Sequence, residues 1–534
     1  MKHRFTALCL LISLPLAAQL PSESLLIVNA SSPGALKVAN HFIHLRHIPD
    51  DRILYLNPPE EFFRENQSTR WRVNRFSVDQ QLLQPVVERL EQLKDPVPTA
   101  LIFSPDWPIH TRHPGGTPVS VTAYIGSRGE LPPEEHIQNG QARSPWFVTP
   151  EERAKGRPLP RFPALSLRNA GLHPSMMLGA FHEPLNPDSI IEALTRSRTA
   201  DFTAPQGSVV IITNTDVRTR ARIHQFEPAK ERLEARGTPV HLAERGAPLP
   251  EAIIGALEGA ANVPVDRYRG RLVPGAFAEH LTSFAGTFHN TQQTKMTEWI
   301  AAGAAGTVGT VDEPLSIWTK FPIAQIFERY LLGNTLLEAL MQSHGHPWQS
   351  LALGDPFCRP WANTLPARLE TSWDKNNLTL TLTGVRSGPG TEAHLYIDGN
   401  RLPGNGPEWT WEAHPETTGP NLDILLHVRR LWAPPELFHL RKMIPTPFDK
   451  NLTLSAPPRQ PRNTLRLVAD GTNDLVQLEL WQGSRRIYQT ETRGKRHTID
   501  LPASLIGEGP VRLQARGIQI NGRMVRSNHW LRSE

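Results

Sequence analysis

The chain has 534 residues, of which 39% are hydrophobic and 20% are charged, and its formal net charge at pH 7 is +5. This length exceeds one ordinary domain, so two to four domains are expected, and the balance of apolar and charged residues excludes a disordered chain. The small net charge does not by itself indicate any class of partner.

The first eighteen residues are typical of a secretory signal peptide. Lys2 and Arg4 precede an apolar run at residues 5–18, which is too short for a comfortable membrane span and ends in small residues. Cleavage near Ala18 predicts an exported protein, periplasmic or extracellular. No later segment reaches ~18 apolar residues, so no membrane span is expected in the mature chain. Cys358 is then the only cysteine, which excludes an internal disulfide.

Residues 19–364 alternate short apolar runs with segments of helical periodicity. Strands are expected at residues 24–30, 52–57, 99–104, 208–213, 251–259 and 306–311. This βαβ order predicts a parallel sheet with right-handed crossovers. We expect residues 25–29, 101–104, 209–213 and 308–311 to lie in one sheet and to run parallel. Residues 105–174 interrupt the pattern as a Pro-rich insertion, in which short elements are expected.

From about residue 365 apolar and polar residues alternate with a period of two, which is typical of half-buried strands. Two β-sandwich modules are expected, at residues 365–455 and 456–534. The second is basic, since residues 451–534 contain 13 Lys and Arg against 7 Asp and Glu. Five cations lie close in sequence across two predicted strands and their hairpin: Arg485, Arg486, Arg493, Lys495 and Arg496. Such a cluster attracts polyanions. The alternative is that these side chains only keep the module soluble.

Several motifs stand out between residues 24 and 362. They are "SSPGALKVANHFIHLRHIP", "PGAFAEHLTSFAG", "AAGAAGTVGTVDEP", "KFP", "LLGNTLLEAL" and "LALGDPFCRP". Together they resemble one uncharacterised family of secreted bacterial proteins, found in genomes that carry the exosortase/PEP-CTERM sorting system. This resemblance implies no known activity.

The order of the same segments resembles the caspase-like fold, in its gingipain-type and CHAT branches. The resemblance implies that one strand ends in a His within a Gly-His-Gly turn and that the next ends in a Cys, whose thiolate attacks the peptide carbonyl. Here the strand at residues 251–259 is followed by two alanines, and the next strand ends near Ser283. Both members of the dyad are missing at these positions. Cys358 follows the final strand, where these enzymes keep no nucleophile. The predicted fold is α/β, a caspase-like parallel-sheet domain followed by two β-sandwich (Ig-like) modules.

Ser283 lies nearest to the nucleophile position, and His280 precedes it by three residues. A serine nucleophile needs an adjacent base and an oxyanion hole. On a strand, positions three apart point to opposite faces, whereas in a helical turn they share a face. One interpretation is a hydrolase that uses Ser283 with His280. The other is that His280 and Thr282 satisfy buried backbone groups.

Asp312 and Glu313 directly follow the strand at residues 306–311. In open parallel sheets ligands bind at this edge, so the two carboxylates line a crevice in one interpretation and a solvated loop in the other. The three histidines of "HFIHLRH" are spaced so that they do not share one helix face, and no metal site is expected from them. No phosphate loop, dinucleotide fingerprint, HExxH or CxxC motif is present, so no cofactor is expected. Export argues against nucleic acid as a partner.

The sequence therefore predicts a secreted, non-catalytic protein with a pseudo-peptidase fold. It is expected to act as a binding or assembly factor at the cell envelope or in extracellular polymer, with an envelope protein or an acidic polysaccharide as its partner. The alternative is an extracellular hydrolase that uses Ser283 with His280.

Overall fold

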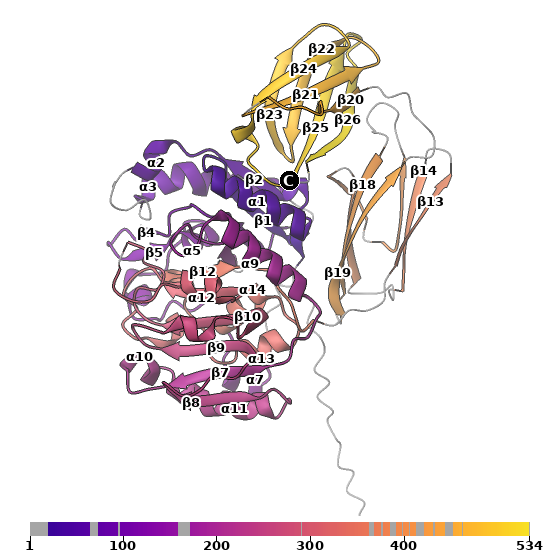
Figure 1. Cartoon of the computed structure of the whole chain (residues 1–534). Coiled ribbons are helices and arrows are strands. Elements are labelled where there is room, and N and C mark those ends of the chain that lie inside the picture. The colour runs from indigo at the N-terminus through magenta and orange to yellow at the C-terminus, as the bar shows by residue number, and fades with distance from the viewer. Residues whose placement is uncertain are drawn as a thin grey trace, which may run out of the picture.

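The computed structural model describes residues 20–532 except 65–72, 94–96, 158–170, 290, 363–367, 375–376, 385–390, 398, 405, 413–420, 431–432, 444–451 and 462. The predicted signal peptide, residues 1–18, lies outside the described residues. The chain forms an α/β domain followed by two β-sandwiches, as expected from the sequence (Figure 1). Within the described ranges, no helix combines the length and the apolar character needed to cross a membrane.

The α/β domain is built on one sheet of ten strands. Five strands run in one direction: β2 (Ile53–Leu56), β1 (Ser24–Asn29), β3 (Ala100–Phe103), β6 (Ser175–Met177) and β12 (Ser350–Gly354). Five run in the other: β11 (Gly306–Thr310), β10 (Leu272–Leu281), β9 (Ile253–Gly259), β7 (Ser208–Thr213) and β8 (Val240–Glu244). The strands follow in this order across the sheet, so the direction changes once, where β11 and β12 pair antiparallel.

The four strands at residues 25–29, 101–104, 209–213 and 308–311 share one sheet as predicted, but the prediction that all four run parallel is wrong. β1 and β3 run opposite to β7 and β11. Along the chain the direction reverses between β6 and β7, which the single helix α9 (Pro187–Ala200) connects. It reverses again between β11 and β12, which α13 (Ile326–Leu331) and α14 (Leu336–Ser343) connect. A fully buried strand has the same apolar composition whichever way it runs, so its direction cannot be predicted from its sequence.

Helices cover both faces of the sheet. Side chains alternate along each strand, so β1 sends Leu26 and Val28 to one face and Leu25 and Ile27 to the other. The first face is covered by α1 (Pro33–Arg46), α9, α11 (Phe226–Glu234), α13 and α14. The second is covered by α4 (Gln84–Gln92), α5 (Val121–Gly126) and α12 (Thr297–Ala302). Shorter helices lie in the connections: α2 (Glu60–Arg64), α3 (Arg75–Val78), α6 (Glu134–Gln138), α7 (Pro150–Ala154) and α10 (Val217–Arg220).

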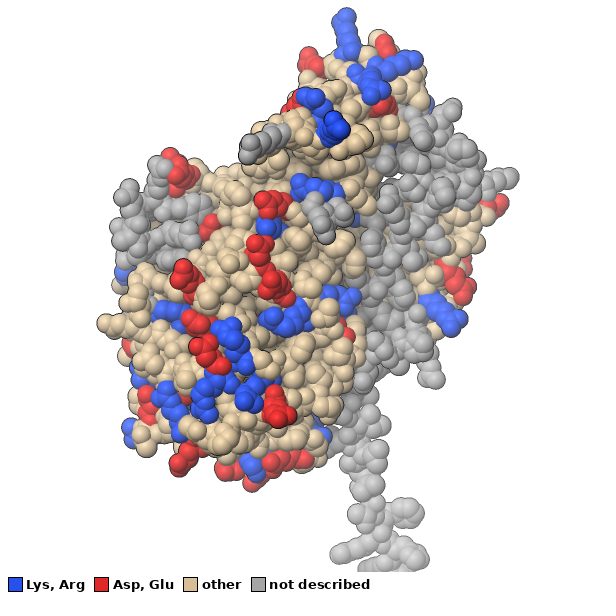
Figure 2. Space-filling model, in the orientation of Figure 1, with Lys and Arg blue, Asp and Glu red and all other residues tan. Residues whose placement is uncertain are grey.

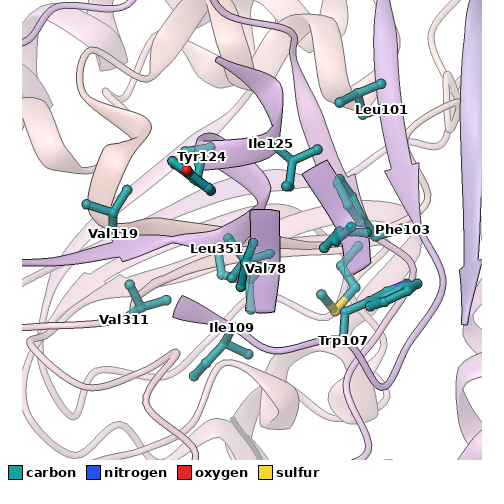
Figure 3. Close-up of a cluster of buried hydrophobic side chains, with 14 of the residues drawn as sticks. Val78, Leu101, Phe103, Trp107, Ile109, Val119, Tyr124, Ile125, Val311 and Leu351 are labelled. Carbon is teal, nitrogen blue, oxygen red and sulfur yellow. The ribbon is translucent and has the colours of Figure 1, made fainter. Parts of the chain in front are cut away.

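One buried cluster joins the two halves of the sheet (Figure 3). Phe103 of β3 packs there with Leu351 of β12 and with Val311, which follows β11. The Pro-rich insertion contains short elements as expected, the hairpin β4 (His110–Arg112) and β5 (Pro118–Ser120) and helix α5, and it contributes Val119 and Tyr124 to the same cluster. Each large apolar side chain stabilises the fold by roughly 1.5–3 kcal/mol when fully buried. The cluster therefore makes the two oppositely directed halves one domain.

Each sandwich has its own apolar core between two antiparallel sheets. The strands of the first are β13 (Arg368–Asp374), β14 (Asn377–Thr383) and β17 (Glu408–Glu412), facing β16 (Asn400–Leu402), β15 (Thr391–Ile397), β18 (Asn421–Arg430) and β19 (Ala433–Met443). Those of the second are β20 (Leu452–Ser455), β21 (Thr464–Gly471) and β24 (Arg496–Pro502), facing β23 (Arg485–Glu491), β22 (Leu475–Gln482), β25 (Val511–Gln519) and β26 (Met524–Arg532).

The second sandwich is joined to the α/β domain by polar contacts around α1. Asn40 donates hydrogen bonds to the carbonyls of Ile506 and Glu508, at 2.9 and 2.8 Å. Arg512 forms an ion pair with Asp50, which begins the 3-10 turn before β2 (Asp50–Arg52). These contacts place the second sandwich over the β1–β2 edge of the sheet, while the first sandwich lies beside the domain (Figure 1).

Candidate functional site

The carboxyl ends of β9 and β10 lie side by side, since these strands pair in parallel up to Gly259 and Leu281. The caspase-like resemblance places a His and a Cys at these two ends. Gly259 leaves no room for a side chain, because a Cβ there would lie 2.4 Å from the backbone nitrogen of Thr219. The geometry of the site is therefore set by the residues that end β10, from Glu279 to Ser283.

His280 is fully buried, and both nitrogens of its ring are hydrogen bonded. Trp299 of α12 donates its indole N–H to Nδ1 at 2.9 Å. Nδ1 must then be an acceptor, so the proton is on Nε2, which donates to the carbonyl of Thr294 at 3.2 Å. Burial removes the water that would solvate a charged imidazole, and this lowers the pKa of His280 to about 3. His280 is neutral, and neither nitrogen is available to a substrate or a neighbouring hydroxyl.

Ser283 lies just past the end of β10 and is 7% exposed. Its carbonyl and that of Thr282 accept hydrogen bonds from Oγ1 of Thr310, at 2.8 and 2.9 Å. Among the residues that the structure describes, no hydrogen bond joins Ser283 to His280. The two are close in sequence, but the extended backbone of β10 carries the His280 ring to Trp299 instead.

Polar residues of the loop after β10 fold back over its end. The side-chain carbonyl of Gln293 accepts hydrogen bonds from Oγ1 of Thr282 at 2.7 Å and from the backbone N–H of Phe284 at 2.9 Å. Nζ of Lys295 donates to the carbonyl of Phe284 at 2.8 Å, and burial lowers the pKa of Lys295 to about 8. Sequence reasoning missed both residues, because a polar stretch between a strand and a helix has no spacing that predicts which strand end it covers.

Glu279 is also engaged inside the protein. It forms a fully buried ion pair with Arg222, which also donates to the carbonyls of Glu258 at 3.0 Å and Pro322 at 3.1 Å. Burial raises the pKa of Glu279, and the guanidinium of Arg222 opposes that rise. The polar residues at positions 279, 280 and 282 therefore all bind structural partners rather than open solvent.

Asp312 and Glu313 lie at the same edge of the sheet, just after β11. Asp312 is half-buried, and burial raises the pKa of its carboxyl group; its Oδ2 accepts a long hydrogen bond from Gln349 at 3.5 Å. Nζ of the buried Lys320 donates to Oε1 of the same Gln349 at 2.7 Å. Glu313 is exposed, and its carboxylate accepts the backbone N–H of Leu315 at 2.9 Å. The two carboxylates thus have different surroundings despite their adjacency.

The five basic residues do not form one cluster. Arg485 and Arg486 begin β23, whereas Arg493, Lys495 and Arg496 follow its other end. Eight residues of extended chain span about 25 Å, which separates the two groups. Arg485 is half-buried with its guanidinium 5.7 Å from the Tyr55 ring, and Arg486 pairs with Glu479 at 2.8 Å. The second group is exposed. Lys and Arg side chains gather at the outer end of the second sandwich in Figure 2.

Cys358 is fully buried, and its thiol donates to the carbonyl of Ser197 at 3.4 Å. Burial raises the pKa of this thiol well above its ordinary value, so almost no thiolate forms near neutral pH. Across the described part of the chain, no three His, Cys, Asp or Glu side chains come together in a way that could hold a metal ion.

Two solved structures are similar to most of the chain. Gingipain R, an Arg-specific cysteine proteinase, matches with a TM-score of 0.45 and 9% identity over 79% of this chain and 99% of its own. The complex of the pro- and mature domains of RgpB from Porphyromonas gingivalis matches with a TM-score of 0.44 and 9% identity over 78% of this chain and 99% of its own.

A shorter match is with the fibronectin(III)-like modules of Clostridium thermocellum CbhA, with a TM-score of 0.13 and 16% identity over 15% of this chain and 90% of that one. No family profile matches the chain, and no curated protein matches its sequence. At these identities the similarities describe the arrangement of strands and helices and carry no information about a reaction.

Proposed function

We propose that the protein is an exported, non-catalytic binding factor that engages acidic polysaccharide through its second sandwich. The observation that carries the non-catalytic part is the double hydrogen bonding of His280. A serine nucleophile needs a base that can accept its proton. His280 has no free nitrogen and a pKa of about 3, so it does not supply that base to Ser283.

The remaining reactive groups near the end of β10 support the same proposal. Lys295 donates a hydrogen bond to the carbonyl of Phe284. The side-chain carbonyl of Gln293 accepts hydrogen bonds from the hydroxyl of Thr282 and the backbone N–H of Phe284. Cys358 lies after the last strand of the sheet and is buried as a thiol. A caspase-like domain of this kind offers a rigid scaffold for the sandwiches rather than a reaction centre.

The proposed ligand follows from charge and exposure. Arg493 and Lys495 are exposed, and in the described structure no carboxylate lies within ion-pair distance of either; Arg496 is 3.6 Å from Asp470 but its side chain is 72% exposed. Three exposed cations, two in the turn between β23 and β24 and one at the start of β24, attract a polymer with regularly spaced carboxylates. An exported protein meets such polymers in the envelope and the extracellular matrix, which favours an acidic polysaccharide over an envelope protein.

Binding to polygalacturonate at 20 mM and 150 mM salt tests the proposal. Wild-type protein is expected to bind at low salt and to lose most of its affinity at 150 mM, where exposed charges are screened over ~8 Å. The change Arg493→Ser, Lys495→Ser and Arg496→Ser should abolish binding without unfolding, since exposed substitutions usually change stability by less than about 0.5 kcal/mol.

A matched variant removes three exposed cations from the α/β domain, Lys155→Ser, Arg220→Ser and Arg236→Ser. It carries the same net charge as the first variant and should bind like wild type. An equal loss of affinity in both variants would show that only net charge matters. An affinity that does not change with salt concentration would contradict the proposal. New reducing ends in the polymer would reveal hydrolysis and would contradict its non-catalytic part.

A further inference from the structure

The α/β domain meets two histidines of the first sandwich at Ser22, which lies in the 3-10 turn before β1 (η1, Pro21–Glu23). The backbone N–H of Ser22 donates to Nδ1 of His427 at 3.2 Å, and its Oγ lies 3.1 Å from Nδ1 of His394. His394 on β15 and His427 on β18 are direct neighbours across the sheet. All three residues are buried. Both imidazole rings thus direct their Nδ1 atoms at Ser22 of the α/β domain.

The contact requires His427 to be neutral. A backbone N–H can donate only to a nitrogen that carries a lone pair, so Nδ1 of His427 is unprotonated and Nε2 carries the hydrogen. Nε2 is buried, and no group in the described structure accepts a hydrogen bond from it. A second proton on Nδ1 would point at the N–H of Ser22 and would place a charge where no water reaches it.

The surroundings of His427 also oppose a positive charge. The titratable and charged groups around it are His394 and Tyr396 of β15, His47 at the end of α1, Asp51 and Arg52 before β2, and Arg359 after β12. Burial lowers the pKa of His427 well below its ordinary 6.5, and the positive potentials of His394, His47, Arg359 and Arg52 lower it further. Burial raises the pKa of Asp51, the carboxyl group of this cluster, so acid removes its negative charge as well.

We propose that this contact is a proton-operated latch, in which acidification releases the first sandwich from the α/β domain. In the docked state His427 stays neutral, and in the released state water solvates its ring so that it takes up a proton. Docking lowers the pKa of His427 below its free value of about 6.5. The contribution of neutral His427 to docking is therefore fully present above about pH 6.5 and is lost as the pH falls below that value. Release coupled to one proton becomes about tenfold more favourable for each pH unit below 6.5.

Hydrogen exchange measured on the full mature chain tests this latch. The opening equilibrium is read from the backbone amide of Ser22, whose N–H donates to His427, after correction for the intrinsic pH dependence of exchange. Between pH 6.5 and 5.0 the opening constant of this amide should rise about 16-fold, while amides of β7 and β9 in the sheet interior stay protected.

The variant His427→Asn keeps an acceptor oxygen near the position of Nδ1 but cannot take up a proton, so its opening constant should stay constant over the same range. His497→Asn is the matched control, because His497 lies in β24 of the second sandwich with Nδ1 2.7 Å from Oγ1 of Thr492. This control should follow the wild type. An opening constant that does not change with pH in the wild type, or that rises equally in His427→Asn, would overturn the proposal. If His427→Asn fails to dock even at pH 7.5, the wild-type titration decides alone.

Discussion

Replacement of Arg46 by Met should destabilise the α/β domain more than any surface substitution. Arg46, at the end of α1, is buried between two carboxylates that are themselves buried, Asp201 after α9 and Asp355 after β12. Its Nε donates to Oδ2 of Asp355 at 3.0 Å, and its two terminal nitrogens contact Asp201 and Asp355. Asp201 keeps a contact with Arg198 at 3.3 Å after the change, whereas Asp355 loses the one cation that faces it in the described structure.

Removal of one partner from a buried ion pair costs about 3–5 kcal/mol, because the remaining charge is left without solvent. The loss should depend on pH. Burial already raises the pKa of Asp355, and Arg46 opposes that rise, so the variant raises it further. A carboxyl group with a raised folded pKa destabilises the fold as the pH rises above its unfolded value of about 3.9. The loss should therefore be larger at pH 7.5 than at pH 4.5.

Scanning calorimetry and urea unfolding of the α/β domain transition measure this loss at both pH values. Lys230→Met is the matched control, because Lys230 forms an exposed pair with Glu234 within one helix, and it should leave the transition unchanged. A loss below about 1 kcal/mol for Arg46→Met, or an equal loss at pH 4.5 and pH 7.5, would refute the reasoning.

Three further predictions rest on single residues. Cys358 should react with Ellman's reagent only after denaturation, and a fast reaction of the native protein at pH 7.5 would contradict its burial. Gly259→Ala should cost about 1–3 kcal/mol in unfolding free energy, since the new Cβ meets the backbone of Thr219; an unchanged transition would show that α10 can move away. The low pKa of His280, about 3, should make stability fall as the pH drops below 6.5. His280→Asn should make that fall less steep between pH 6.5 and 4.5, whereas the control His136→Asn, whose side chain is 43% exposed, should leave the slope unchanged.

The strands of the α/β domain could be predicted because each is a buried apolar run, as at Leu25–Val28 and Val209–Ile212. The reversals between β6 and β7 and between β11 and β12 could not, because they depend on how the connecting helices α9, α13 and α14 pack on the sheet and not on the composition of the strands. The two sandwiches followed from the alternation of apolar and polar residues, which reports directly on a sheet with one buried face.

The site shows why nearness in sequence is a poor guide along a strand. His280 and Ser283 are three residues apart, yet the partner of the His280 ring is Trp299, which is brought there by the packing of α12 on the sheet. Arg485 and Arg493 are separated by the length of β23, so one predicted cluster becomes two. Arg222 and Glu279 are 57 positions apart and form a buried pair that no local pattern signals.

The central claim is that the end of β10 holds no activated nucleophile. Treatment of the mature protein with a fluorophosphonate probe between pH 5 and pH 9, followed by mass spectrometry of the peptide that contains Ser283, tests it most directly. Because His280 is neutral and hydrogen bonded at both ring nitrogens, we predict no adduct on Ser283 at any pH in this range. A stoichiometric adduct on Ser283 that disappears in His280→Asn would contradict the account and would establish a serine hydrolase.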